Sequence, residues 1–277
     1  MCIRDRKETF RNLPPKPGLY RVRAINGQEL FYLGQTGLDL RARLGALRNN
    51  TMKTVMPFND PHTAAPSLWA WRDAEGIEFE CAAAPVQLAE DKEEARRRRE
   101  GLEFYLLWQY RLECGASTWC NHGRFHPRYI KSTDRKKGLV GYRLSDDAPD
   151  NVAGGLSLSP LKLQGDPLDR DWMGVSWSDF FSLVVTELKH VPASPGVYKI
   201  IDPLTNELLY IGESNNLLDR FKSHAVKTWT GSASIVAYVQ LPFGTPSYQR
   251  HEIENDLVAG YYARTLLVPR FQLLNHR

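Results

Sequence analysis

Cysteine is scarce in this chain. Four of its 277 residues are cysteines, at irregular spacing: Cys2, Cys81, Cys114 and Cys120. A chain of this length can bury a sizeable hydrophobic core without disulfide bonds, so the class of small disulfide-stabilised secreted proteins is excluded. We therefore expect reduced thiols and a cytoplasmic location.

Long apolar runs are lacking too. No stretch approaches the roughly 18 consecutive apolar residues that span a bilayer. The charged opening, residues 1–6, has no apolar segment behind it that would act as an export signal. The sequence thus predicts no membrane partner. Because this opening does not resemble the start of a domain, we also expect the chain to be a fragment of a longer protein.

A strong excess of one charge is also missing. The chain has 36 Lys and Arg residues against 32 Asp and Glu residues, for a formal net charge of +4. Such a mild basic excess is compatible with a polyanionic partner, although it usually reflects only a solvated surface. Charge alone therefore does not identify a partner.

What the sequence does contain is an internal repeat. Residues 16–20 (Lys-Pro-Gly-Leu-Tyr) are echoed by residues 194–198 (Ser-Pro-Gly-Val-Tyr), and residues 31–36 are echoed by residues 209–214. Both pairs of segments are offset by 178 positions. A repeat at a fixed offset indicates that one structural unit is used twice.

A third match between the copies has a smaller offset. Glu103 and the apolar residues that follow it have the same spacing as Glu254 and its followers, at an offset of 151 positions. The first copy must therefore carry an insertion, which we place at about residues 46–74.

Each copy is predicted to begin with two strands. In copy one, residues 20–24 and 28–33 flank Asn26 and Gly27, the dipeptide that best suits a tight two-residue hairpin turn. In copy two, residues 197–201 and 207–211 enclose a longer loop that is rich in turn-forming residues.

Helical spacing follows the second strand in each copy. The apolar residues with this spacing are Leu40, Leu44 and Leu47 in copy one and Leu217, Leu218 and Phe221 in copy two. A third strand is predicted at residues 77–82 and 234–241, and a further helix at residues 90–112 and 249–263. The sum is an α/β (α+β) fold with two domains, each a small three-stranded, mostly antiparallel sheet flanked by helices.

The two domains are placed at residues 1–150 and 151–277. The first includes the insertion and ends in a basic tail, and the second begins with a connector. Residues 132–174 are rich in Gly, Pro, Ser and Asp, which is typical of connectors and surface loops. Residues 177–188 are predicted to form an amphipathic helix capped by Ser178.

Two pairs of tripeptides suggest a family. Gly-Leu-Tyr and Tyr-Leu-Gly occur in copy one, and Gly-Val-Tyr and Tyr-Ile-Gly in copy two. An Arg, a Glu and an Asn follow in the same order in each copy. This pattern resembles the GIY-YIG nuclease superfamily, with two tandem copies in one chain. The matching residues are Tyr198, Tyr210, Arg220, His224, Glu254 and Asn275 in copy two, and Tyr20, Tyr32, Arg43, Glu103 and Asn121 in copy one.

The end of copy one adds to the likeness. Residues 120–125 (Cys-Asn-His-Gly-Arg-Phe) and the basic tail after them resemble the end of the domain in bacterial, restriction-like or repair-like members, where the Asn closes the core. The match of the helix arginine is ambiguous, because either Arg41 or Arg43 fits within one residue. We prefer Arg43, since Leu44 after it parallels Phe221 after Arg220.

The resemblance implies a metal-dependent endonuclease that hydrolyses phosphodiester bonds of DNA, which we expect to be double-stranded. Glu103 and Glu254 would bind Mg²⁺ or Mn²⁺, because a carboxylate is a hard oxygen ligand. Arg43 and Arg220 would clamp the scissile phosphate with their planar fork of donors. Further substrate-binding roles fall to Arg41, Asn121 and Asn275.

The family assigns proton transfer to the tyrosines. Tyr20 or Tyr198 would take a proton from the attacking water, and Tyr32 or Tyr210 would position the water or the phosphate. A phenol with an ordinary pKa near 10 is a poor base at neutral pH. Nearby positive charge must lower that pKa, or His224 must share the task in copy two.

Three alternatives remain open. Copy one has an ambiguous helix arginine and lacks an obvious counterpart of His224, which also fits a non-catalytic DNA-binding or scaffolding module. The chain is also compatible with a structure-specific repair nuclease or with an enzyme that acts on RNA, since no recognition motif distinguishes these.

Three weaker patterns have simpler interpretations. The helix segment 93–100 contains four consecutive arginines, which more often form a solvated face than a phosphate-binding stripe. Trp69 and Trp71 favour core packing over base stacking. The set Cys114, Cys120, His122 and His126 matches no strong zinc-binding spacing.

Overall fold

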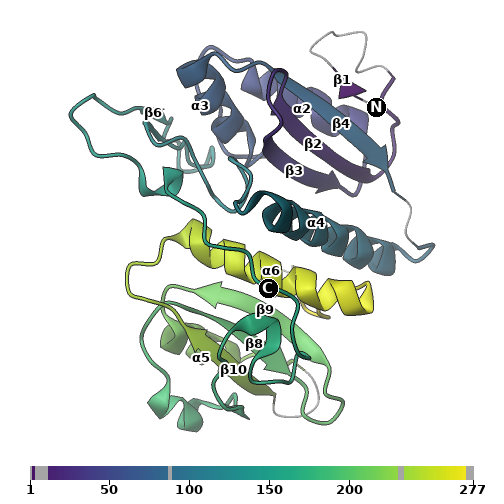
Figure 1. Ribbon diagram of the computed structural model, residues 1–277, viewed down its shortest axis with the longest axis vertical. Helices are drawn as coiled ribbons and strands as arrows, with labels where there is room; N and C mark the ends of the chain where they lie inside the picture. Colours follow the sequence, from purple (N-terminus) through teal and green to yellow (C-terminus); the bar gives the residue numbers. More distant parts are fainter. Residues whose placement is uncertain (1, 4–11, 87–88, 230–233, 273–277) are drawn as a thin grey trace. The chain divides into compact units, whose positions relative to one another are not determined.

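Two small antiparallel sheets organise the chain (Figure 1). The computed structural model describes residues 2–3, 12–86, 89–229 and 234–272. Its mixed α/β composition with small antiparallel sheets confirms the predicted class.

The first sheet has the strand order β1-β4-β2-β3. These strands are β1 (Cys2–Ile3), β2 (Gly18–Ala24), β3 (Leu30–Thr36) and β4 (Phe79–Pro85). The strand with the first tripeptide, β2, is interior and pairs antiparallel with both β3 and β4. Its residues alternate in direction, so Tyr20 and Val22 enter the core while Arg21 is exposed.

The second sheet repeats this arrangement with the order β7-β10-β8-β9. Its strands are β7 (Phe181–Ser182), β8 (Gly196–Ile201), β9 (Leu208–Ser214) and β10 (Ile235–Gln240). The predicted number of three strands per sheet is wrong, because each sheet has a fourth, two-residue strand on the free edge of β4 or β10. The three long strands of each sheet lie close to the predicted ranges.

The helices flank these sheets. They are α2 (Leu40–Thr51), α3 (Ala65–Glu75), α4 (Lys92–Cys114), α5 (Leu217–Ala225) and α6 (Ser247–Thr265). The helix α3 occupies most of the second half of the stretch that we interpreted as an insertion. Asp39 caps α2 by accepting a hydrogen bond from the Ala42 amide, and Asn216 caps α5 by accepting one from the Asp219 amide.

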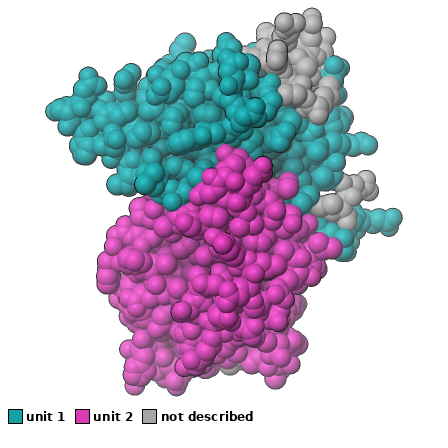
Figure 2. Space-filling view, in the orientation of Figure 1, with its two compact units in different colours: residues 1–103, 116–157 teal, residues 104–115, 158–277 magenta. Residues whose placement is uncertain are grey.

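The chain divides into two compact units (Figure 2). Unit 1 comprises residues 1–103 and 116–157, and unit 2 comprises residues 104–115 and 158–277. The helix α4 is thus shared: its first half, through Glu103, belongs to unit 1 and its second half to unit 2. Sequence periodicity alone gave no reason to divide this helix.

The predicted tight turn at Asn26 and Gly27 is wrong. The ladder between β2 and β3 ends at Arg23 and Leu30 and has an irregularity after Val22, which leaves a longer connection. Neither Asn26 nor Gly27 has a positive φ among the described residues, whereas the tight turn requires positive φ at both central positions.

The predicted amphipathic helix at residues 177–188 is also wrong. This segment contains β7 and a 3₁₀ helix, η3 (Val185–His190). Ser178 does not cap a helix: its amide donates to the Tyr238 carbonyl, and its Oγ accepts from the Tyr238 amide. Backbone bonding to the open edge of β10 therefore outweighs the helical spacing of the apolar side chains.

The predicted connector at residues 132–174 is largely irregular. The short elements between α4 and β7 are β5 (Tyr129–Ile130), β6 (Tyr142–Arg143), and the 3₁₀ turns η1 (Val152–Gly154) and η2 (Trp172–Gly174). The strands β5 and β6 pair with each other as a separate ribbon.

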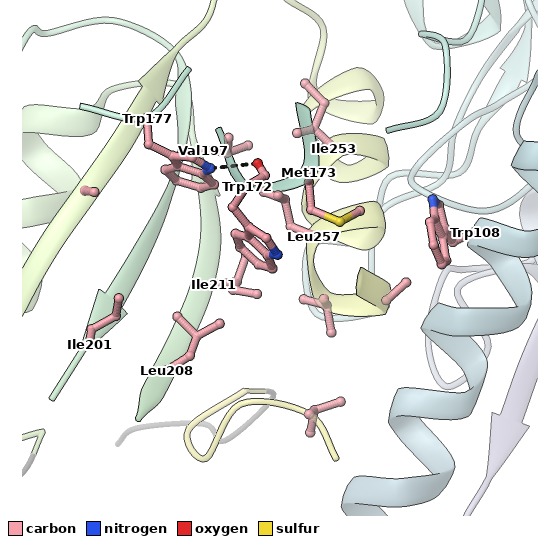
Figure 3. Packing of buried hydrophobic residues seen from close by; sticks show 14 residues of the cluster. Trp108, Trp172, Met173, Trp177, Val197, Ile201, Leu208, Ile211, Ile253 and Leu257 are labelled. Carbon is pink, nitrogen blue, oxygen red and sulfur yellow. Dashed lines mark hydrogen bonds between the residues drawn. The ribbon is translucent and has the colours of Figure 1, made fainter. Parts of the chain in front are cut away.

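A dense aromatic and aliphatic core stabilises unit 2 (Figure 3). Trp172 is fully buried, and its ring stacks on that of Trp177 with centroids 5.9 Å apart. The Trp177 indole N–H donates to the Trp172 carbonyl. Met173 packs against Gly260 of α6, where a side-chain Cβ would collide with its sulfur. The connector thereby contributes directly to the core beside β8 and β9.

Candidate active sites

Two tyrosines on adjacent strands form the base of each candidate site. Tyr198 on β8 and Tyr210 on β9 have ring centroids 6.0 Å apart, and Tyr20 on β2 and Tyr32 on β3 have the same separation. In each sheet the first tyrosine lies opposite the glycine of the Tyr-x-Gly tripeptide, Gly212 or Gly34. The register of the two strands therefore brings the tyrosines of both tripeptides side by side on the sheet, although the tripeptides are separated in the sequence.

The tripeptide glycines make room for these rings. A Cβ at Gly212 would lie 2.5 Å from the Tyr198 hydroxyl oxygen and 2.6 Å from Cε1 of Tyr210. A Cβ at Gly34 would lie 2.8 Å from the Tyr20 hydroxyl oxygen and 2.6 Å from Cε1 of Tyr32. Any side chain at either position would thus displace both phenols.

In unit 2, α5 brings a histidine to the first tyrosine. The Tyr198 hydroxyl lies 2.7 Å from Nε2 of His224, and both side chains are buried. The ring of Trp229 packs edge-on against that of His224, with centroids 5.1 Å apart, and its indole N–H donates to the His224 carbonyl. One proton therefore lies between the Tyr198 oxygen and Nε2 of His224 in this buried hydrogen bond.

In unit 1, an arginine takes the corresponding contact. Nε of Arg43 donates to the Tyr20 hydroxyl at 3.2 Å. Arg41 instead donates from Nε to the Leu13 carbonyl, so the geometry favours Arg43 as the site residue. Leu40 and Leu217 begin equivalent helices, which makes Arg43 the positional counterpart of Arg220.

The same helix register explains the missing histidine of copy one. Counting from Leu40 and Leu217, the position of His224 is held by Leu47, which is buried in the core of unit 1. A different histidine, His62, comes from the loop before α3 and lies close enough to Arg43 for their charges to interact. Burial, followed by the Arg43 charge, lowers the pKa of His62 to about 4. His62 is therefore neutral at physiological pH.

A glutamate completes each site. Glu103 on α4 and Glu254 on α6 are half-buried, and neither carboxylate accepts a hydrogen bond from any described residue. Burial raises the pKa of each carboxyl to about 8, with a further increase from Glu100 at Glu103 and from Glu213 at Glu254. Arg43 and Arg220 oppose these increases. The two carboxyls thus lack a sufficient cationic partner within the protein.

Burial also governs the tyrosines. It raises the pKa of Tyr198 and Tyr32 well above the ordinary value and that of Tyr210 to about 12. It raises the pKa of Tyr20 as well, although the Arg43 charge and hydrogen bond act in the opposite direction. The phenols are therefore protonated at neutral pH.

The asparagine predicted for substrate binding in copy one contacts the backbone. Oδ1 of Asn121 accepts from the Leu33 amide at 2.9 Å, and its Nδ2 donates to the Leu33 carbonyl at 2.8 Å. Leu33 is the middle residue of Tyr-Leu-Gly. This amide therefore fixes β3 from one side, as expected of a residue that closes the core.

The counterpart in unit 2 is a glutamine, which the sequence pattern does not predict. Asn275 lies outside the described residues, whereas Oε1 of Gln272 accepts a hydrogen bond from the Ile211 amide at 3.0 Å. Ile211 is the middle residue of Tyr-Ile-Gly. Gln and Asn present the same amide group, so a search for asparagine alone overlooked this position.

The donor sets suit a metal held by one protein ligand. Among the described residues no three His, Cys, Asp or Glu side chains converge, so a closed cage is absent from that part of the chain. A single half-buried carboxylate without a hydrogen bond is nevertheless a fitting ligand for a hard divalent cation that keeps several waters. Glu103 and Glu254 are the residues that would hold it. The zinc interpretation receives no support, since Cys120 is buried and Cys114 exposed.

The weaker sequence patterns are structural. Trp69 is buried and donates to the Lys53 carbonyl, and Trp71 packs edge-on against Trp119 and His126. Arg96 bonds Glu93 and Glu100, and Arg98 pairs with Glu94, as on a solvated helix face. Arg99 differs from these neighbours, because it turns toward the site.

No protein-family model matches the chain, and no curated protein matches it. Among the described helices, none combines the length and the apolar character needed to cross a membrane.

Proposed function

We propose that this chain is a metal-dependent DNA endonuclease of the GIY-YIG type, with one active site in each unit. The observation that carries this proposal is the recurrence of one quartet: two tyrosines, an arginine and a glutamate that interact electrostatically in both units. The four residues come from separate elements, so their repeated convergence is not a consequence of one local motif. In unit 2 they are Tyr198, Tyr210, Arg220 and Glu254.

The residue types match what phosphodiester hydrolysis requires. Water attacks phosphorus, the bond to the leaving oxygen breaks, and charge accumulates on the phosphoryl oxygens. Arg220 or Arg43 would neutralise part of that charge through its planar donors. A divalent cation on Glu254 or Glu103 would add Lewis-acid polarisation of the phosphate when bound.

Proton transfer in unit 2 would run through a pair of side chains. The raised pKa of Tyr198 makes its phenolate a rare species at neutral pH, but His224 lies in direct contact with the hydroxyl. Tyr198 would accept the water proton as its own proton passes to Nε2 of His224. This relay answers the objection that a phenol alone is too weak a base.

Cleavage of a supercoiled plasmid tests the proposal. The parent chain should nick and linearise DNA with Mg²⁺ or Mn²⁺ and should be inactive in EDTA. Glu103→Ala and Glu254→Ala should each nick but fail to linearise, because each retains one site, and the double variant should do neither. Linearisation by both single variants at the parental rate would contradict two active sites.

A second candidate function is specifically favoured by Leu47. Because this leucine stands where unit 2 has His224, unit 1 would act as a non-catalytic DNA-binding module. Full nicking by Glu103→Ala together with loss of all nicking in Glu254→Ala would favour this version. Cleavage of labelled duplex, flap, single-stranded DNA and RNA oligonucleotides would separate a restriction-like enzyme from a repair nuclease or a ribonuclease.

A further inference from the structure

Each site contains a second arginine outside the tyrosine, arginine and glutamate pattern. Arg99 precedes Glu103 on α4 by four residues, and Arg250 precedes Glu254 on α6 by four residues. A spacing of four places the arginine and the glutamate on the same helix face. Arg99 and Glu103 interact electrostatically, so this arginine faces the carboxylate of its site.

Both arginines are held by the residue that follows the Tyr-x-Gly tripeptide. Nε of Arg99 donates to Oε1 of Gln35 at 2.7 Å, and Nε of Arg250 donates to Oε2 of Glu213 at 2.5 Å. Gln35 and Glu213 are equivalent positions of the repeat, at the offset of 178. The contact is thus repeated in both units, while the charge of the acceptor differs.

The hydrogen bonds of the Nη atoms also differ between the two arginines. Nη1 of Arg250 donates to the Thr245 carbonyl at 2.6 Å, and its side chain is 11% exposed. Arg99 is half-buried, and within the described parts of the chain its two Nη atoms have no hydrogen-bond acceptor. Gly37 makes space for this group, because a Cβ there would lie 2.7 Å from Nη2 of Arg99.

The two sites therefore carry different charge. Gln35 is neutral, and Glu100, the other carboxylate that acts on Arg99 and Glu103, is already paired with Arg96 at 2.7 Å. Arg99 therefore adds positive charge to that of Arg43 beside Glu103. Glu213 is a carboxylate that pairs with Arg250 and also lies 3.4 Å from Nε2 of His251. Glu213 acts electrostatically on Glu254 and Tyr210 as well, so it makes the site of unit 2 more negative.

We infer that Arg99 is a second phosphate-binding residue of unit 1, oriented by Gln35 with both Nη groups free for a backbone phosphate of the nucleic acid. Arg250 is withdrawn from this role by Glu213. Unit 1 is consequently the half that holds the polyanion more firmly, and the residue after Tyr-x-Gly decides the difference. The inference rests on the proposed function.

The salt dependence of DNA binding measures such a contact directly. Each phosphate contact contributes about 0.9 to the slope of log K against log salt concentration, which is roughly an eightfold change in affinity for each tenfold change in salt concentration. Binding of the full chain to a labelled duplex in EDTA excludes cleavage. Arg99→Ala should reduce the slope by about 0.9, and Arg250→Ala, the matched variant, should leave it unchanged.

Two exchanges at the acceptor position provide the decisive comparison. Gln35→Glu retains the contact to Arg99 and should reduce the slope as Arg99→Ala does, without removing a packing group. Glu213→Gln should increase the slope, because it releases the charge of Arg250. Equal slopes for the parent, Arg99→Ala and Gln35→Glu would overturn the inference.

A parallel plasmid assay with Mg²⁺ distinguishes failure of the inference about Arg99 from failure of the proposed function. If the parent cleaves DNA while Arg99→Ala and Gln35→Glu bind with the parental slope, the role of Arg99 is wrong and the proposed function stands. If the parent neither binds nor cleaves any nucleic acid, both are wrong.

Discussion

The Tyr198 hydroxyl lies 2.7 Å from Nε2 of His224, and both side chains are buried. No element near Tyr198 in the sequence supplies this contact: the tyrosine comes from β8 and the histidine from the last turn of α5. In unit 1 the corresponding phenol accepts from Arg43 instead. The two sites therefore share their tyrosines and differ in how a proton would leave them.

This difference predicts unequal effects of removing a histidine. His224→Ala should lower cleavage by unit 2 by about 10²–10⁴-fold, the usual contribution of a general base. The measurement is single-turnover cleavage in a Glu103→Ala background, so that only unit 2 acts. His62→Ala in the same background is the control, since it lies in unit 1. A parental rate for His224→Ala would exclude the proton relay.

The two phenols pack closely against Gly212, so adding one methyl group there should strongly reduce the activity of unit 2. Gly212→Ala should displace Tyr198 and Tyr210 and abolish cleavage by unit 2, because the added Cβ would lie 2.5 Å from the Tyr198 hydroxyl oxygen and 2.6 Å from a ring carbon of each tyrosine. Gly45→Ala is the matched control: it lies within α2 with no atom within 4 Å of the new Cβ. That variant should retain activity and gain about 0.5–1 kcal/mol of stability. Far-UV circular dichroism would show that both variants fold.

The raised pKa of Glu254 predicts a pH-dependent loss of stability. The folded chain keeps the proton up to about pH 8, whereas the unfolded carboxyl releases it near 4.5. The favourable contribution of the protonated form is therefore complete below pH 4.5 and is lost as pH rises through 8. Glu254→Gln should be more stable than the parent at pH 9 by roughly 1–2 kcal/mol, after allowance for solvent screening.

Urea unfolding of the two proteins in EDTA, from pH 4 to pH 9, would check this difference. Addition of Mg²⁺ at pH 8 should stabilise the parent and leave a Glu103→Gln, Glu254→Gln double variant unchanged, because a cation would compensate the buried charge. Parallel stability curves for the parent and Glu254→Gln would argue against the predicted proton uptake.

A buried ion pair should dominate the stability of unit 2. Nε of Arg111 donates to Asp256 at 2.9 Å, and both side chains are at most 1% exposed. Arg111 also donates to the Leu158 carbonyl, while Glu252 accepts from the Leu158 amide. Arg111→Ala should cost about 3–5 kcal/mol, since it leaves buried carboxylates unpaired.

The surface pair between Arg128 and Asp150 is the control for this prediction. Arg128→Ala removes this pair and the bonds to the Ala148 and Ser145 carbonyls. It should lower the free energy of unfolding by less than Arg111→Ala does, because a pair with the solvent-exposed Asp150 contributes only about 0–1 kcal/mol. Chemical denaturation of both variants would compare them. Equal destabilisation would mean that the packing of the arginine stems, and not the burial of charge, determines the result.

The helices and strands predicted most accurately are those whose apolar residues recur at a clear period. The helices α2 and α5 begin at Leu40 and Leu217, where the predicted spacing starts. The wrong predictions concern the turn at Asn26 and the stretch at residues 177–188. There, pairing with a neighbouring strand competes with local preference, and the local sequence does not contain the partner.

The residues of the candidate sites also fall into those that the sequence predicts and those that it does not. Its tyrosines, Arg43, Arg220 and the two glutamates follow from the repeat, because a motif kept in order twice identifies them. Gln272 and His62 do not, since neither has the expected residue type at the expected place. The orientation of Arg99 by Gln35 also required the structure, because it joins residues 64 positions apart.

The sequence by itself determined the repeat, the small antiparallel sheets with flanking helices, and the motif residues, because these depend on local periodicity and on residue order. Tertiary structure alone decided that Tyr198 contacts His224, that Glu213 neutralises Arg250 where Gln35 leaves Arg99 charged, and that Arg111 joins the second half of α4 to unit 2. Such contacts join segments that are remote in the sequence, so no short stretch of the chain predicts them. The resulting burial and distances between charged groups then determine the pKa of each side chain.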